Sequence, residues 1–196
     1  AASKAGILVT NTPDVLTETT ADLGFTLMMA AARRITEAEQ WLRDGNWRGW
    51  SFRSLLGADI HGSTLGILGM GRIGQGIARR AGGFGMRVLY HNRSRLPEAV
   101  EREYRAEYVG FDELLAQSDH LLLVLPYSAQ SHHIIDAAAL AKMKPTATLS
   151  NIARGGLATR RAMVSLAVDN LIAALGFGPD AGRPPTPVNA DALRRQ

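Results

Sequence analysis

Residues 64–74 read TLGILGMGRIG, an apolar run that leads directly into a Gly-x-Gly-x-x-Gly loop. Residues 75–84 beyond the loop have helical composition, so the pattern is that of a strand, a tight turn and a helix. In this pattern Gly69 permits the turn, Gly71 lets the backbone approach a pyrophosphate, and Gly74 lets the helix pack closely on the strand. The helix N-terminus adds unpaired N–H groups that suit phosphate oxygens. We therefore predict a dinucleotide-binding loop; the alternative is a glycine-rich turn that binds nothing.

Two further residues, Arg72 and Ile73, stand between the second and third glycines of the loop. The Arg72 guanidinium either reaches a phosphate oxygen or remains solvated, and both interpretations stay open. We include Arg72 and Ile73 among the predicted cofactor contacts.

The end of the next strand predicts which dinucleotide binds. Proteins that prefer NAD place an Asp or Glu about 20 residues beyond the loop to bind the ribose hydroxyls, whereas an Arg there accommodates a 2′-phosphate. Here the segment is Asn92, Arg93, Ser94 and Arg95, without a carboxylate. Two guanidinium groups and a hydroxyl suit a 2′-phosphate, so NADP is favoured, with NAD as the alternative. The competing interpretation is a solvated basic turn.

Strand-like and helix-like segments alternate along the chain. Apolar runs predict strands at residues 7–10, 64–68, 87–91, 120–125 and 147–152. Helical composition predicts helices at 17–42, 75–84, 96–106, 111–117, 136–142 and 159–175, with Thr17 or a neighbouring hydroxyl capping the first. Parallel neighbouring strands need crossover connections, which such helices supply. The predicted fold class is α/β, a Rossmann-type doubly wound parallel sheet with helices on both faces.

Composition limits the class of protein. The chain has 196 residues, 46% of them hydrophobic, enough for one large domain or one domain plus a fragment of another. Cysteine is absent, which excludes disulfides and thiolate nucleophiles, and we predict no metal site. The net charge of +4 comes largely from scattered arginine pairs, so an anionic small ligand explains it as well as nucleic acid would. No apolar stretch approaches the roughly 20 residues that cross a bilayer, and we expect a soluble, cytoplasmic protein that binds neither nucleic acid nor membrane.

Three aromatic residues, Trp47, Trp50 and Phe52, follow the first long helix in a loop of mixed polarity. We expect them to anchor that loop against a neighbouring surface. A subunit interface is the more specific form of the same hypothesis.

From about residue 6 to residue 156 the chain resembles the D-2-hydroxyacid dehydrogenases, most closely the glyoxylate/hydroxypyruvate (2-ketoacid) reductase branch. The resemblance rests on four motifs in the family's order and spacing: NTPDVLTE (11–18), TLGILGMGRIG (64–74), LLVLP (122–126) and NIARGG (151–156). It implies a Rossmann domain inserted into a flavodoxin-like substrate domain. Residues 1–11 would then be a remnant of the substrate domain and its hinge, 12–157 the cofactor domain with a dimerisation helix, and 158–196 a C-terminal helix and tail returning to the substrate domain.

The resemblance also implies roles for individual residues. Val124, Leu125 and Pro126 would line the cofactor crevice, and Thr17 would face the nicotinamide side. Arg154 would be catalytic, because its fork can hold a 2-keto acid by the carboxylate and polarise the carbonyl for hydride attack; the alternative is a loop arginine paired with a local carboxylate. The long helix before the glycine loop implies a homodimer.

Two departures from the family pattern bear on catalysis. The N-terminal substrate domain is almost wholly absent, and between Gly156 and Ala158 the chain omits roughly fifty to seventy residues, about two strand–helix steps. In the family that stretch carries the catalytic histidine and the acid that orients it. The remaining histidines are interpreted as structural or solvated: His61, His91, His120, His132 and His133. The chain is either part of a longer protein, which we favour because the loss would expose an apolar sheet edge, or a shortened product.

The leading hypothesis is an NADPH-preferring reductase of small 2-keto acids, such as glyoxylate or hydroxypyruvate, to D-2-hydroxy acids. A different class is a non-catalytic dinucleotide-binding or dimer module. A third is a relative of formate and phosphite dehydrogenases, which share the glycine loop and the arginine. Their usual working direction reduces NAD, so the basic segment at Asn92–Arg95 favours the first hypothesis.

Overall fold

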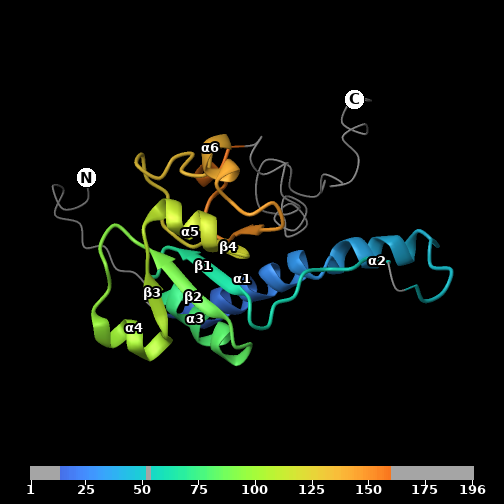
Figure 1. The fold of residues 1–196 in the computed structure, drawn as a ribbon, viewed down its shortest axis with the longest axis horizontal. Helices are drawn as coiled ribbons and strands as arrows, with labels where there is room; N and C mark the ends of the chain where they lie inside the picture. The colour runs from blue at the N-terminus through green and yellow to red at the C-terminus, as the bar shows by residue number, and fades with distance from the viewer. Residues whose placement is uncertain (1–13, 52–53, 160–196) are drawn as a thin grey trace.

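A computed structural model describes residues 14–51 and 54–159 of the chain (Figure 1). The strand expected at residues 7–10, Phe52 of the aromatic loop, and all but the first residue of the helix expected at 159–175 lie outside the described residues.

The centre of the molecule is a five-stranded parallel sheet with the strand order β3-β2-β1-β4-β5. The strands are β1 (Thr64–Leu68), β2 (Arg87–His91), β3 (Ala106–Tyr108), β4 (His120–Leu123) and β5 (Thr148–Asn151). The helices are α1 (Thr17–Ala32), α2 (Ile35–Arg43), α3 (Arg72–Gly83), α4 (Glu98–Tyr104), α5 (Phe111–Gln117) and α6 (Ala137–Ala141). The predicted α/β class with a doubly wound parallel sheet is confirmed.

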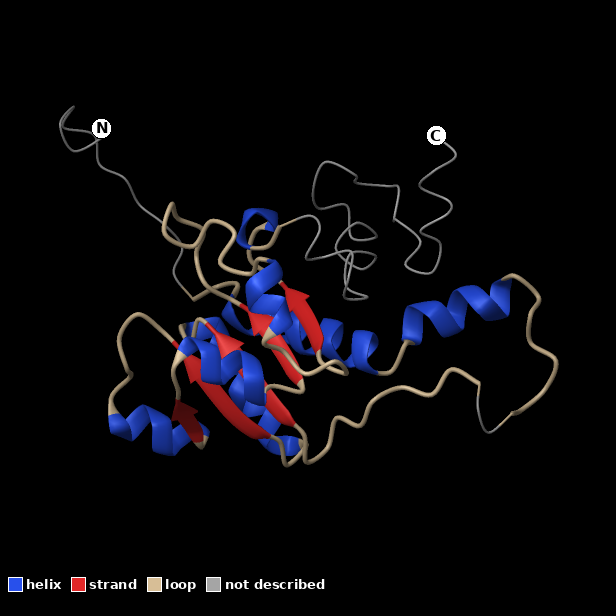
Figure 2. Ribbon diagram, turned by 45° about the horizontal axis from the view of Figure 1, so that its top comes forward, coloured by secondary structure: helices blue, strands red, loops and turns tan. Residues whose placement is uncertain are grey.

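Both faces of the sheet are covered, which explains why the strands are continuous apolar runs (Figure 2). Ile67 aligns with Tyr90 on one neighbouring strand and with Leu122 on the other, and all three face α1 and α3. The residues next to them, such as Leu68 and Leu123, belong to the second apolar cluster with α5 and α6. The strict alternation along each strand therefore divides the core into two layers.

The expectation of one helix over residues 17–42 is wrong, because the helix breaks after Ala32 and restarts at Ile35. Arg34 adopts the left-handed conformation (φ 53°), and the Ala32 carbonyl accepts a hydrogen bond from the Ala58 N–H at 2.8 Å. The loop that carries Ala58 thus satisfies a carbonyl group that, in a continuous helix, would accept a hydrogen bond within the helix. Nor does Thr17 cap α1, because the N-cap is Leu16 and no side chain bonds there.

The helix expected over residues 96–106 is also wrong at its end. It stops at Tyr104, Arg105 turns left-handed (φ 49°), and the unpredicted strand β3 follows at once. Three residues are too few to show the alternation that reveals a strand, so the neighbouring helical composition obscured β3. Among the described residues, the other predicted strands and helices are present, some with ends shifted by a few residues.

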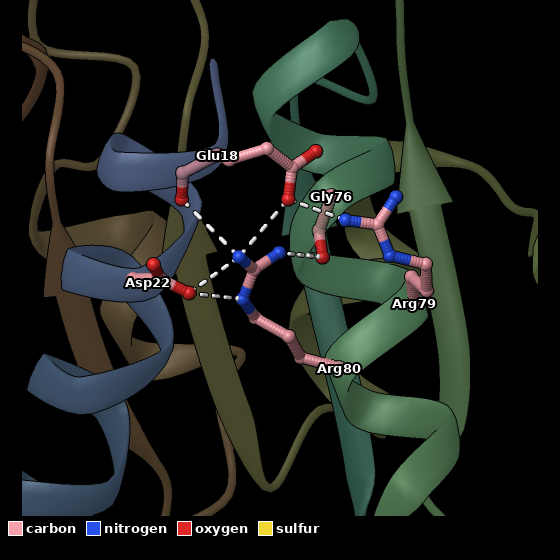
Figure 3. Close-up of polar contacts among 5 residues, drawn as sticks. All are labelled: Glu18, Asp22, Gly76, Arg79 and Arg80. Atoms are coloured by element: carbon pink, nitrogen blue, oxygen red, sulfur yellow. Dashed lines mark hydrogen bonds and ion pairs between the residues drawn. The ribbon is translucent and has the colours of Figure 1, made fainter. Parts of the chain in front are cut away.

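Arg80 on α3 links this helix to α1 through several hydrogen bonds (Figure 3). The Arg80 guanidinium donates from Nε to Asp22 at 2.7 Å, from Nη1 to the Gly76 carbonyl at 2.7 Å, and from Nη2 to the Glu18 carbonyl at 3.2 Å. Arg79 adds an ion pair to Glu18. Because Glu18 lies in the first turn of α1, this network holds the start of α1 beside the helix that follows the glycine loop.

The described part of the chain contains no helix that is both long and apolar enough to span a membrane. Among the same residues, no group of three or more His, Cys, Asp or Glu side chains is arranged to hold a metal ion.

Candidate functional site

The strand order determines where a ligand would bind. The chain runs outward from β1 through β2 to β3, then crosses back to place β4 and β5 on the other side of β1. In open parallel sheets such a reversal leaves a crevice outside the carboxyl ends of the two central strands. The predicted site residues 69–74, 92–95, 124–126 and 154 follow β1, β2, β4 and β5 respectively, so they share this one edge.

Two of the three loop glycines are required by the protein's own packing. Gly69 has φ +105°, and a Cβ on it would lie 2.6 Å from the Leu125 nitrogen. A Cβ on Gly74 would lie 2.5 Å from the Gly69 carbonyl oxygen. The loops after β1 and β4 therefore touch, and the helix α3 presses directly on the loop.

Gly71 is different, because a Cβ built on it would meet no protein atom within 4 Å. It is the N-cap of α3, and no side chain caps the N–H groups of the first turn of this helix. Packing does not explain a glycine here, whereas close approach of a pyrophosphate does. The loop thus fits a dinucleotide phosphate on grounds independent of the sequence pattern.

Asn92 has a role that the sequence did not reveal. Its Oδ1 accepts a hydrogen bond from the Met70 N–H at 2.7 Å, while the His91 carbonyl accepts one from the Gly69 N–H at 3.1 Å. The end of β2 therefore holds the glycine loop in shape. The Nδ2 amide group of Asn92 remains available as a donor.

Arg72 was expected either to reach a phosphate or to be solvated, and the structure adds a partner. Its Nη1 lies 3.0 Å from Oδ1 of Asp14, three residues before α1, and both side chains are exposed. Because Asp14 lies just before Thr17, the first residue of α1, this ion pair joins the start of α1 to the glycine loop. Ile73, by contrast, is half-buried against the α1 and α3 layer of the core.

The basic segment contains one free and one paired guanidinium. Arg93 and Ser94 are exposed, and Arg93 makes no ion pair among the described residues. Arg95 donates from Nε to Oε1 of Glu101 at 2.9 Å and from Nη2 to Oε2 at 2.7 Å. Hydrogen bonds from Arg95 and then Tyr90 lower the pKa of Glu101, so the carboxylate is ionised at neutral pH.

Val124, Leu125 and Pro126 follow β4 at the sheet edge that also carries the glycine loop. The Val124 N–H bonds the Leu68 carbonyl at 2.9 Å, extending the pairing with β1, and Leu125 lies against Gly69. Val124 and Leu125 are half-buried and Pro126 is exposed. These three residues form an apolar border to the glycine loop.

Arg154 lies beyond the end of β5 and is exposed. Its Nη1 donates to the neighbouring Ala153 carbonyl at 2.8 Å, and its own carbonyl accepts from Asn151 Nδ2 at 3.0 Å. The backbone of the turn is thus held, and no described carboxylate pairs with the guanidinium. A fixed arginine without a protein counter-ion can bind an anionic substrate group.

Three of the five histidines occupy two separate environments. His120 is buried at the opposite edge of the sheet, with its ring nitrogens near Thr148 Oγ1 at 2.8 Å and the Asp59 carbonyl at 3.2 Å, and is structural. His132 and His133 stack with ring centroids 3.7 Å apart, and the His133 N–H bonds the Gly156 carbonyl at 2.8 Å. The sequence did not indicate that this pair lies beside the turn that carries Arg154.

The aromatic loop is not anchored as expected. Trp47 meets Trp41 of α2 edge-on at 6.2 Å, but Trp50 is 80% exposed. Packing within the described chain therefore leaves Trp50 without a covering surface. The more specific form of this expectation, a subunit interface, stays a prediction.

Comparison with known families identifies the family to which this chain belongs. Residues 25–189 match the family model described as the NAD binding domain of D-isomer specific 2-hydroxyacid dehydrogenases. The chain is 49% identical over 180 residues to the glyoxylate reductase of Thermococcus onnurineus strain NA1, which covers 90% of this chain and 54% of the relative. It is 48% identical over 177 residues to the glyoxylate reductase of Korarchaeum cryptofilum, covering 90% and 53%. The chain therefore spans about half the length of the curated relatives it matches.

Solved structures agree. A glyoxylate reductase from Paecilomyes thermophila superposes with a TM-score of 0.75 at 46% identity, over 83% of this chain and 48% of that one. A D-lactate dehydrogenase from Aquifex aeolicus, solved in complex with NAD and lactic acid, gives a TM-score of 0.73 at 32% identity, over 83% and 48%. The expected family resemblance is confirmed.

Proposed function

This chain belongs to the D-isomer specific 2-hydroxyacid dehydrogenase family, and we propose that the full-length protein is a reductase of glyoxylate or a similar small 2-keto acid. The observation that carries the proposal is the placement of Arg154 at the same sheet edge as the glycine loop, with its backbone held and no carboxylate partner among the described residues. Similarity to glyoxylate reductases supports the choice of substrate.

Each element of the site would have a separate task. The glycine loop and the start of α3 hold the pyrophosphate, and residues 124–126 border the crevice. The bound nicotinamide supplies the hydride. Arg154 would hold the substrate carboxylate with its fork, which orients C2 and draws electron density from the carbonyl.

The substrate assignment is tested with glyoxylate and NADPH in the full-length protein. Turnover supports a reductase, whereas NADPH binding without oxidation would instead support a non-catalytic dinucleotide module. Arg154→Gln should raise KM for glyoxylate about 100-fold while leaving the Kd of NADPH unchanged, because the arginine contacts the acid and not the cofactor. Arg154→Lys is the matched control, retaining the charge and losing the fork.

We propose NADPH as the preferred cofactor, with Arg93 and Ser94 at the 2′-phosphate. The support is the absence of a carboxylate from residues 92–95 and the exposed Arg93 guanidinium, which forms no ion pair within residues 14–51 and 54–159. Arg93→Ala should raise the Kd of NADPH about tenfold or more and that of NADH less than twofold. Equal losses for the two cofactors would contradict the preference.

We further propose that the protein is a homodimer in which α2 and the loop after it contact the partner. The support is a set of large apolar side chains that this segment exposes: Ile35, Leu42, Trp47, Trp50 and Leu56. Exposed apolar patches of this kind are typical of subunit interfaces. Analytical ultracentrifugation of the full-length protein tests the assembly directly.

A further inference from the structure

The ion pair between Arg95 and Glu101 joins the basic segment to helix α4. The Arg95 guanidinium donates two charge-assisted hydrogen bonds to the Glu101 carboxylate, from Nε to Oε1 and from Nη2 to Oε2, so the contact is bidentate. The Glu101 side chain is only 8% exposed, whereas that of Arg95 is 64% exposed. The arginine therefore covers a buried carboxylate, and two of its nitrogens are already occupied.

A third residue, Tyr90 of β2, completes the arrangement from inside the core. Its hydroxyl donates to Oε1 of Glu101 at 2.7 Å and accepts from the Leu96 N–H at 2.8 Å. Tyr90 is fully buried, and burial, with the neighbouring carboxylate, raises its pKa to about 12. The hydroxyl thus stays protonated and remains a donor throughout the working range of pH.

These contacts hold both ends of a short segment. Tyr90 precedes it on β2, the Leu96 N–H closes it, and Glu101 grips Arg95 from α4. Asn92 is held at the other end by the Met70 N–H. Between these fixed points, Arg93 and Ser94 project into solvent.

We propose that Tyr90 and Glu101 form a brace, closed by Arg95, that fixes the segment so that Arg93 and Ser94 meet the 2′-phosphate of NADPH. In this proposal Arg95 is a positioning residue and not a phosphate ligand. Because the brace orders the segment before the cofactor binds, the entropic cost of ordering it does not weaken binding. Glu101 also neutralises the charge of Arg95, so selectivity for NADPH depends on Arg93. The inference depends on the proposed NADPH preference.

The test is a binding experiment on the full-length protein, titrating NADPH, NADH and adenosine 2′,5′-bisphosphate. Glu101→Gln and Arg95→Ala should each raise the Kd of NADPH and of the bisphosphate about tenfold, and that of NADH less than twofold. The double variant should bind NADPH no more weakly than either single variant, because both substitutions remove the same brace. Glu98→Gln is the matched control, since Glu98 is an exposed glutamate on the same helix paired with Arg102, and it should bind like the parent.

A direct Arg95–phosphate contact predicts a different pattern. Arg95→Ala would then weaken NADPH, while Glu101→Gln, by freeing the guanidinium, would leave binding unchanged or tighten it; that result would overturn the proposal. Tyr90→Phe provides a second variant, expected to give a smaller loss, should Glu101→Gln fail to fold. Arg93→Ala distinguishes failure of the brace from failure of the NADPH preference. If Arg93→Ala weakens binding of NADPH alone and Glu101→Gln weakens neither cofactor, only the brace is rejected. If Arg93→Ala weakens NADPH and NADH equally, the NADPH preference is rejected.

Discussion

The glycine-loop region and the α2 segment differ in how their residues meet solvent. Around the loop, Met70 and Ile77 are fully buried, and the N–H groups of Gly69 and Met70 bond His91 and Asn92 at the end of β2. In α2, which extends away from the sheet in Figure 1, no residue is buried. The first region is stabilised by its own chain, while the second exposes apolar surface that only another surface can cover.

The two regions also differ in how their charged side chains are paired. Arg80, at the junction of α1 and α3, is bound to both helices and is mostly buried. The ion pair of Arg43 with Glu39 on α2 is exposed and local. Interactions of the first kind join elements distant in sequence, whereas exposed pairs one helical turn apart add about 0.5 kcal/mol at most. The difference places more of the stability in the sheet region, and it agrees with the proposed interface at the α2 segment.

The largest expected effect separates the two regions by core packing. Ile67→Ala, at a fully buried position in β1, should lower the free energy of unfolding by about 3 to 4 kcal/mol, because it leaves a cavity between α1 and the sheet. Leu42→Ala on α2, where the side chain is 58% exposed, should cost the monomer less than about 0.5 kcal/mol. Urea unfolding measures both. Comparable losses at the two positions would remove the distinction.

Within the loop itself, Gly69→Ala should cost about 2 to 3 kcal/mol, because φ is +105° and the new Cβ meets the Leu125 backbone. Gly71→Ala should leave stability nearly unchanged and weaken NADPH binding at least about tenfold. Urea midpoints and fluorescence titration provide the two readouts. If Gly71→Ala bound NADPH normally, the phosphate would not approach this glycine.

Assembly should respond to α2 and not to the loop. Leu42→Asp should raise the dimer dissociation constant about 100-fold, since it places a charge in the proposed interface. The unfolding of the separated monomer should not change. Sedimentation measures the first quantity and urea unfolding the second, with Glu39→Gln on the same helix as control. A dimer that survives Leu42→Asp would place the interface elsewhere.

The smallest expected effect is the pH dependence of the Glu101 brace. Because the folded pKa of Glu101 lies below its unfolded value near 4.3, the unfolded chain takes up the proton first as pH falls. The stability from this carboxylate is therefore complete at neutral pH, declines below about pH 4.3, and is lost below the folded pKa. The difference in Tm between the parent and Glu101→Gln should close over that range. A difference that stays constant with pH would mean that the ionised carboxylate is not the source.

The sequence by itself determined the features that depend on local pattern. Continuous apolar runs between helical stretches predict a parallel sheet, and the glycine spacing at 69–74 predicts the turn, because strand burial and tight backbone geometry select those residue types directly. The absence of a carboxylate at 92–95 is equally visible without coordinates.

Only the tertiary structure decided which of these groups are already engaged. The break at Arg34 depends on Ala58 bonding the end of α1, and the roles of Asn92, Arg72 and Arg95 depend on Met70, Asp14 and Glu101. These partners come from other elements, or from across a turn whose shape the composition does not specify. Composition tells which side chains can bind an anion, but whether a guanidinium is free for a ligand depends on what the fold places within reach of it.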